Sequence, residues 1–221
     1  MRIGDAAIAE LRRKGFVVIE KFLTEEERDE VLRDFYRDYA PPYETWSKQQ
    51  KEIRAGGGEP PAPTLYRSLP TFPWKSRVLN RLVTHPDIID AAERITGTRE
   101  IWISTGALAM KYAGQKYWDV FHRDFGNNTL GPRPEPSEDI GVVSFGFFLD
   151  DVREGGAPIL IVPYGRPVAE AVPVLVPGGS MVIYTIGVEH SASPFTVPAG
   201  HRPAVWSVLS RKDRLWEGRR T

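Results

Sequence analysis

Cysteine is absent from this sequence of 221 residues, and histidine occurs only four times. The absence of cysteine excludes disulfide bonds, zinc–thiolate sites and cysteine nucleophiles. Any metal ion must therefore be held by histidine, aspartate or glutamate. The 29 basic and 29 acidic side chains give a formal net charge of zero, so no global charge favours nucleic acid or an anionic membrane surface as a partner.

Long apolar runs are also missing. No stretch approaches the roughly 20 apolar residues of a membrane-spanning helix, and residues 1–15 carry charges where a secretory signal has an apolar core. We therefore expect a cytoplasmic protein with neither a membrane nor a nucleic acid as partner. Hydrophobic residues still make up 41% of the chain, which suffices for the core of a single domain over residues 1–221. Nothing in the pattern specifies an oligomeric state.

The first part of the chain has helical patterning. Thr24 and Glu27 form a capping box ahead of apolar residues at helical spacing, which predicts a helix over about 25–39. A second helix is predicted over about 86–96, because a proline opens it and a glycine follows its apolar face. Residues 42–63 are polar and end in a Gly- and Pro-rich run, which predicts a mobile loop.

The pattern changes near residue 100. Residues 100–210 consist of short segments rich in Val, Ile, Phe and Trp that are separated by Gly and Pro. Six or more such strands without intervening helices indicate an antiparallel sandwich or barrel. We therefore expect a β core from this part, with residues 1–99 as a helical and loop region that covers its outside.

The segment FHRDFG, residues 121–126, places a histidine two positions before an acid. Alternate residues of a strand share a face, so His122 and Asp124 would project together. A third metal ligand would have to come from one of the other histidines. His85 precedes a helix, where capping or a solvated role is ordinary, while His190 ends a strand and His201 begins one.

Two imidazoles and one carboxylate form the facial triad of non-haem Fe(II) sites. A His-x-Asp pair alone favours ordinary surface polar residues, because chance produces it often. The β-rich setting, the strand-end position of His190 and the arginine at position 202 favour a metal site. Zinc accepts the same ligands. A zinc- or manganese-dependent hydrolase or isomerase, and a non-catalytic jelly-roll binding module, therefore stay open as alternatives.

The order of these segments resembles that of the phytanoyl-CoA dioxygenase-like family of Fe(II)/2-oxoglutarate-dependent oxygenases. The similarity covers nearly the whole chain and rests on GFVVIEKFLTEEERDEVL, HPDIIDAAERITG, FHRDF, FFLDDVREGGAPILIVPYGRP, VPGGSMVIYTIGVEHSASPF and RPAVWSVLS. One departure is Arg166 in VPYGRP, where the family usually has a histidine that is not an iron ligand. The resemblance implies a mainly β fold, a double-stranded β-helix of the jelly-roll or cupin type with flanking N-terminal helices.

The resemblance also implies a site. His122, Asp124 and His190 would hold Fe(II), and Arg202 would bind the far carboxylate of 2-oxoglutarate. Phe145 would lie beside this cosubstrate, with an ordinary core aromatic as an equal alternative.

The reaction implied by the resemblance is hydroxylation of an unactivated C–H bond with O2, releasing succinate and CO2. The substrate would be a small molecule, namely a lipid or acyl compound, an amino-acid derivative or a natural-product scaffold. Asp124, which halogenating members of the family lack, implies oxygenation.

The last strand poses a choice between two neighbours. Adjacent strand residues face opposite ways, so only one of His201 and Arg202 can face the interior. We predict Arg202, with Trp206 on the same face, because a permanently charged fork suits a carboxylate and a histidine is mostly neutral at pH 7. Loops 42–76 and 126–139 are predicted to form the mouth of the site.

Overall fold

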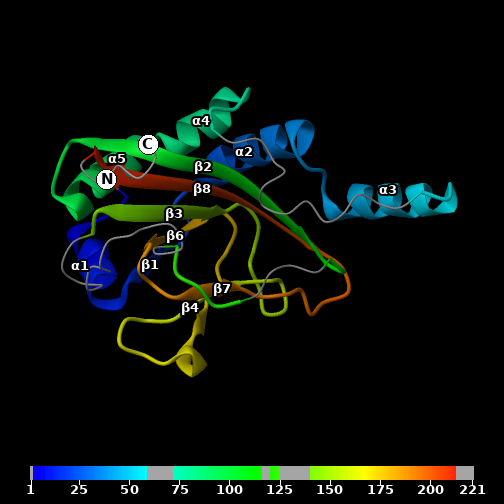
Figure 1. Ribbon diagram of the computed structural model, residues 1–221. Helices are drawn as coiled ribbons and strands as arrows, with labels where there is room; N and C mark the ends of the chain where they lie inside the picture. Colours follow the sequence, from blue (N-terminus) through cyan, green and yellow to red (C-terminus); the bar gives the residue numbers. More distant parts are fainter. Residues whose placement is uncertain (1, 59–71, 116–119, 125–139, 213–221) are drawn as a thin grey trace, which may run out of the picture.

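Two antiparallel β-sheets lie face to face at the centre of the protein (Figure 1). The computed structural model describes residues 2–58, 72–115, 120–124 and 140–212. The larger sheet has the strand order β1-β6-β3-β8-β2. Its strands are β1 (Phe16–Ile19), β2 (Ile101–Tyr112), β3 (Val142–Phe148), β6 (Ser180–Thr185) and β8 (His201–Arg211).

The smaller sheet has the order β5-β4-β7. Its strands are β4 (Ile159–Ile161), β5 (Val172–Pro173) and β7 (His190–Ala192), and a short 3-10 helix, η1 (Val168–Glu170), precedes β5. Together the two sheets confirm the predicted mainly β, jelly-roll fold. The N-terminal region also contributes a strand, because β1 pairs with β6 at one edge of the larger sheet.

Among the described residues, five α-helices precede the second strand: α1 (Asp5–Lys14), α2 (Glu25–Asp38), α3 (Tyr43–Ala55), α4 (Arg77–Val83) and α5 (Pro86–Thr96). The predicted helices over 25–39 and 86–96 correspond to α2 and α5. Helices α4 and α5 pack against the larger sheet, and α2 packs against α4 (Figure 1). No helix among the described residues is long and apolar enough to cross a membrane.

Local chemistry explains where α2 and α5 begin. The Thr24 hydroxyl accepts a hydrogen bond from the backbone N–H of Glu27 at 3.2 Å, and the Glu27 carboxylate accepts one from the N–H of Thr24 at 2.9 Å. This is the predicted capping box. At the start of α5, the His85 ring accepts from the N–H of Asp87 at 3.2 Å, so His85 has the capping role that its position favoured.

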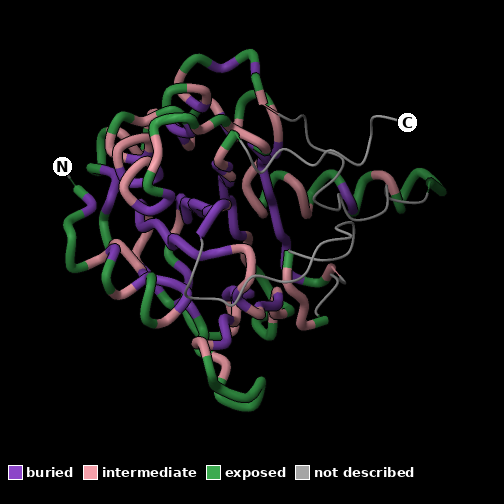
Figure 2. Tube along the Cα trace, turned by 60° about the vertical axis from the view of Figure 1, so that its left-hand side comes forward, coloured by how far each residue is buried: buried purple, intermediate pink, exposed green. Residues whose placement is uncertain are grey.

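The predicted loop over 42–63 is wrong for residues 43–55, which form α3. This helix extends away from the sheets and is mostly exposed (Figure 2). Glu, Lys, Gln, Arg and Ala dominate it, and these residues favour a helix without needing an apolar face. Trp46 attaches α3 to the sheet, because its ring stacks on Tyr112 with centroids 4.3 Å apart. Residues 59–63 lie outside the described part of the chain.

The larger sheet has a separate apolar cluster on each face. Phe145, Val205 and Leu209 belong to the cluster beneath the helices. Ala204 and Trp206, which alternate with Val205 along β8, belong to the cluster between the two sheets. The inner cluster is completed by residues of both sheets, including Phe148, Ile159, Ile161, Val182 and Tyr184.

We expect Gly146→Ala to destabilise the fold. A Cβ atom at this position would overlap the six-membered ring of Trp206, which lies opposite Gly146 in the register of β3 and β8. Overpacking of this kind costs about 1–3 kcal/mol, and each kcal/mol lowers Tm by roughly 2–4 °C in a chain of this size. Thermal unfolding measures the change.

The matched control is Gly187→Ala, because a Cβ at Gly187 meets no atom within 4 Å. Equal Tm values for the two variants would mean that the indole ring of Trp206 is not seated on β3.

Candidate metal centre

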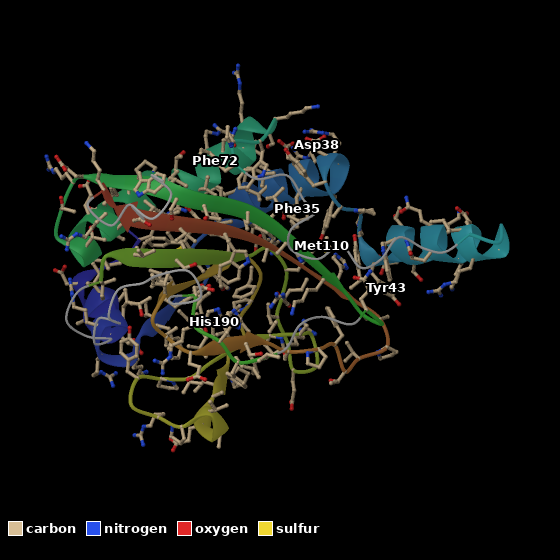
Figure 3. All side chains as sticks on the ribbon, viewed as in Figure 1. Phe35, Asp38, Tyr43, Phe72, Met110 and His190 are labelled. Atoms are coloured by element: carbon tan, nitrogen blue, oxygen red, sulfur yellow. The ribbon has the colours of Figure 1, made fainter. Side chains whose placement is uncertain are left out.

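His122 and His190 face each other across an isolated β-bridge. The N–H of each residue donates to the carbonyl of the other, both at 2.9 Å. This short ladder places the two rings on the same side, with centroids 4.5 Å apart. The bridge therefore brings together two histidines that lie far apart in the sequence, and His190 lies on the side of the larger sheet opposite to Phe35 of α2 (Figure 3).

Asp124 completes a cluster of three possible ligands. Its Oδ1 atom lies 3.7 Å from Nε2 of His122 and 3.7 Å from Nε2 of His190. One ligand atom from each residue lies within 4.8 Å of the other two. These are the three residues that the sequence singled out, and they form the one cluster of this kind among the described residues.

Backbone carbonyls determine which nitrogen of each ring carries a proton. Nδ1 of His122 lies 2.9 Å from the carbonyl oxygen of Val120, and Nδ1 of His190 lies 3.1 Å from that of Val188. A carbonyl can only accept, so each Nδ1 must be the donor. In this tautomer the lone pair of each ring is on Nε2, the nitrogen nearer to Asp124, which is the arrangement that a metal-ligating histidine needs.

The surroundings favour a neutral His190. Burial lowers the pKa of this imidazole, with the charge of Asp124 acting in the opposite direction. The side chain of His190 is only 7% exposed, whereas those of His122 and Asp124 are 26% and 39% exposed. A metal binds the deprotonated form of its ligands, so a His190 that resists protonation is prepared for ligation.

Tyr184 supports the cluster and was not found from the sequence. Its hydroxyl donates to Oδ2 of Asp124 at 3.4 Å, and its ring lies 4.9 Å from that of His190. The only signal was its place in β6, two positions after the inward-facing Val182. This contact leaves Oδ1 of Asp124 as the oxygen that faces both imidazoles.

Arg202 faces the interior, as predicted, and His201 faces the helices. The guanidinium of Arg202 donates to the carbonyl of Ala157 at 2.7 Å and lies 5.4 Å from the centre of the Phe148 ring. His201 instead lies 2.8 Å from the hydroxyl of Tyr36 on α2. The two residues therefore serve opposite faces of β8.

Lys111 lies beside Arg202, and the sequence alone did not predict a role for it at this site. The two residues are partners in the register of β2 and β8, so their side chains leave the sheet on the same face. Lys111 is 8% exposed and Arg202 is 5% exposed, and the Lys111 ammonium donates to the carbonyl of Ser193 at 3.3 Å. Two neighbouring buried cations make this part of the interior suitable for an anion.

Phe145 is not brought to this site. It is fully buried in the cluster beneath the helices, on the face opposite to Trp206. Within the predicted mouth loops, residues 126–139 lie outside the described part of the chain, and so do residues 59–71 of the other loop.

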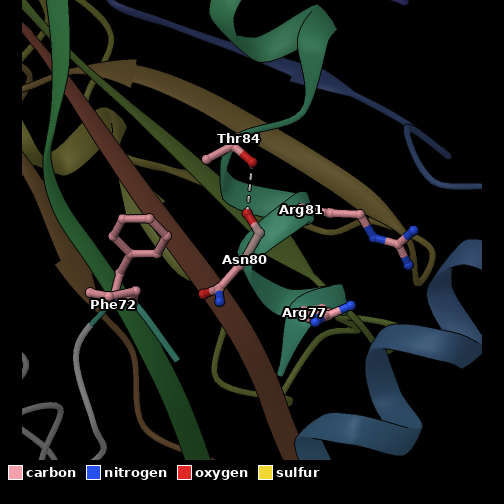
Figure 4. A pocket seen from close by; sticks show the side chains of 6 residues that line it. Phe72, Arg77, Asn80, Arg81 and Thr84 are labelled. Carbon is pink, nitrogen blue, oxygen red and sulfur yellow. Dashed lines mark hydrogen bonds between the residues drawn. The ribbon is translucent and has the colours of Figure 1, made fainter. Parts of the chain in front are cut away.

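A pocket of about 540 Å³ lies at α4, away from these residues (Figure 4). The Thr84 hydroxyl donates to the carbonyl of Asn80 at its wall, at 2.9 Å. The pocket is lined by Phe72, Pro73, Arg77, Asn80, Arg81 and Thr84. None of these residues belongs to the cluster of His122, Asp124 and His190, so the pocket is separate from the candidate metal centre.

Comparison with known proteins extends the description of the fold. No protein-family model matches the sequence, and no curated protein matches it. Solved structures do match. EctD from S. alaskensis has a TM-score of 0.69 and 16% identity over 95% of this chain and 77% of its own. HygX from Streptomyces hygroscopicus, solved with nickel and 2-oxoglutarate bound, has a TM-score of 0.66 and 12% identity over 95% of this chain and 87% of its own.

A third similar structure is the non-heme alpha ketoglutarate dependent epimerase SnoN from nogalamycin biosynthesis. It has a TM-score of 0.62 and 18% identity over 93% of this chain and 81% of its own. At these identities the likeness concerns the fold. The chain therefore shares the jelly-roll architecture of these structures over nearly its whole length.

Proposed function

We propose that this chain is a non-haem Fe(II)/2-oxoglutarate-dependent oxygenase. His122, Asp124 and His190 would hold the iron, and Arg202 would bind the far carboxylate of 2-oxoglutarate. The proposal is carried by one observation: Nε2 of His122 and Nε2 of His190 each lie 3.7 Å from Oδ1 of Asp124, and backbone carbonyls hold both imidazoles.

The donor set fits the proposed metal. Two neutral imidazoles and a single carboxylate are the facial triad of Fe(II) oxygenases, which leaves further positions on the metal for other ligands. When bound, Fe(II) would supply oxygen activation, so that oxidative decarboxylation of 2-oxoglutarate to succinate and CO2 accompanies hydroxylation of a C–H bond. Structural neighbours described as 2-oxoglutarate-dependent or solved with 2-oxoglutarate support this choice.

The chain's own residues would position the reactants. The guanidinium fork of Arg202 matches a carboxylate, and Lys111 adds positive charge beside it. Tyr184 would hold Asp124 in place through its hydrogen bond. The apolar cluster between the sheets would keep bulk water from the reacting atoms.

The substrate in this proposal is a small molecule, and O2 is the second reactant. As part of the same proposal, we assign the chain to the phytanoyl-CoA dioxygenase-like family on the ordered sequence motifs. Residues 1–221 would act as one domain, since the N-terminal region supplies β1 to the sheet that carries Arg202.

The test is turnover of 2-oxoglutarate by the purified chain. With Fe(II) and O2, we expect slow succinate formation without any added substrate, and faster formation when a library compound is hydroxylated. Anaerobic samples and Zn(II)-loaded samples should form none. A hydrolase or isomerase that uses zinc or manganese would need neither O2 nor 2-oxoglutarate. Calorimetry that finds no 2-oxoglutarate binding to the metal-loaded chain would contradict the proposal.

A further inference from the structure

Trp206 carries a buried donor that no described residue accepts. The residue is only 5% exposed, and its indole Nε1 has no hydrogen-bond partner among the described residues. Buried polar side chains nearly always have a partner, and an exception calls for an explanation. An indole nitrogen can only donate, so the group that satisfies it must be an acceptor.

The position of Trp206 relates it to the candidate metal centre. Its ring contacts Tyr184 in an edge arrangement at 5.8 Å and Phe148 at 6.1 Å. The ring of Tyr184 in turn lies 4.9 Å from His190, while that of Phe148 lies 5.4 Å from the guanidinium carbon of Arg202. Trp206 therefore stands in a row of aromatic rings that links the metal centre to the arginine.

The packing of the indole indicates where the N–H edge points. The atoms that a Cβ at Gly146 would overlap are Cζ3, Cη2 and Cε3 of Trp206. All three belong to the six-membered ring, so that ring is seated on β3. These atoms form the edge of the indole opposite to Nε1, so the N–H lies on the edge that faces away from Gly146.

We propose that the indole N–H of Trp206 donates a hydrogen bond to a carboxylate oxygen of a dicarboxylate bound between the metal centre and Arg202. This inference rests on the proposed function, because it takes 2-oxoglutarate as that ligand. The surroundings suit an anion, because Lys111 and Arg202 face the same interior. The indole N–H would also form a stronger hydrogen bond with a charged carboxylate than with a neutral acceptor.

The first experiment compares Trp206→Phe with the unchanged chain. Phenylalanine keeps an aromatic ring over Gly146 and removes the N–H. In Zn(II)-loaded protein, which does not turn over, calorimetry should give a Kd for 2-oxoglutarate at least roughly tenfold higher in the variant. The affinity for Zn(II) itself should stay the same, because Trp206 is not a ligand.

The matched control is Val182→Ala. Val182 is buried in the same inner cluster and lies opposite Gly146 in the register of β3 and β6, but it has no polar side-chain atom. The Val182→Ala variant should lower Tm because it leaves a packing defect, and its Kd for 2-oxoglutarate should stay within about twofold of that of the unchanged chain. If Trp206 had only a packing role, the Kd would change by a similar factor in both variants. Equal tenfold losses in the two variants would overturn the proposal.

A second experiment observes the N–H directly in the unchanged chain. The six tryptophans give separate indole N–H signals by NMR, and Zn(II) is diamagnetic. The signal of Trp206, assigned by triple-resonance experiments, should move downfield when 2-oxoglutarate is added. If 2-oxoglutarate binds but this signal and the Kd of Trp206→Phe are unchanged, the inference fails and the proposed function stands. If the unchanged chain does not bind 2-oxoglutarate, both fail.

Discussion

Replacing His190 by alanine is expected to abolish both Fe(II) binding and Fe(II)-dependent succinate formation. The substitution leaves two of the three proposed ligands, His122 and Asp124, which are also the more exposed pair. Loss of a group that merely orients a ligand weakens metal binding by about 10–100-fold. Loss of a ligand should therefore weaken it by at least about a hundredfold. Anaerobic calorimetry with Fe(II) measures the affinity, and succinate release measures the activity.

The control for this variant is His85→Asn, which removes a histidine outside the cluster. Asn is a favourable N-cap residue, so it can replace the His85 ring at the start of α5. This variant should keep the Fe(II) affinity and activity of the unchanged chain. His190→Ala should remain folded, because the apolar clusters on both faces of the larger sheet do not depend on the metal. Unchanged Fe(II) affinity in folded His190→Ala would show that the ligand set is wrong.

Part of the cluster of possible ligands could be predicted, because the geometry of His122 and Asp124 follows from a short-range rule. The two-residue period of an extended chain puts His122 and Asp124 on one face, and this holds even though the segment forms only an isolated bridge. Its position at a strand end favoured His190 over His85, which precedes a helix and caps it, while the choice of His190 over His201 followed from the resemblance to a known family. Local position alone was therefore sufficient for the pairing of His122 with Asp124, but not for the choice of His190.

The facing of β3 could not be predicted in the same way. Val143, Phe145 and Phe147 point to the helices, and Phe148 points between the sheets. Both faces of this strand are buried, so its sequence is a nearly continuous apolar run. No alternation of polar and apolar residues indicates which side chains point to which face of the sheet. The expectation for Phe145 depended on that facing. The pairing of β3 with β8, in which Gly146 lies opposite Trp206, determines which face Phe145 occupies.

Residues whose role depends on a neighbouring strand were missed for a related reason. Lys111 looks like a single cation in an apolar strand until the register pairs it with Arg202. Tyr184 of β6 contacts Asp124, which lies 60 residues before it in the sequence. The register of long-range pairing sets both contacts, and no local sequence signal encodes it. Helix α3 was missed because its sequence has a helix-forming composition but little of the apolar periodicity that marks packed helices.

The second large effect is expected for the proposed carboxylate anchor. Arg202→Ala should raise the apparent Michaelis constant for 2-oxoglutarate by roughly ten- to a hundredfold, because a charge-assisted hydrogen bond to a carboxylate is worth about 1.5–3 kcal/mol. The buried guanidinium faces the inner cluster beside Lys111 and lies over Phe148. Initial rates of succinate formation over a range of 2-oxoglutarate concentrations give this constant, and calorimetry gives the Kd.

His201→Ala is the neighbouring control, and it should leave the Michaelis constant nearly unchanged. His201 lies on the helix-covered face, where its ring contacts the Tyr36 hydroxyl and accepts from the N–H of Tyr43. Its loss should therefore lower Tm without reaching the cosubstrate. Arg202→Lys should fall between the unchanged chain and Arg202→Ala, since it keeps the charge but not the two-pronged geometry. A 2-oxoglutarate affinity that survives Arg202→Ala and is lost in His201→Ala would reverse the assignment, because it would place the anchor on the opposite face of β8.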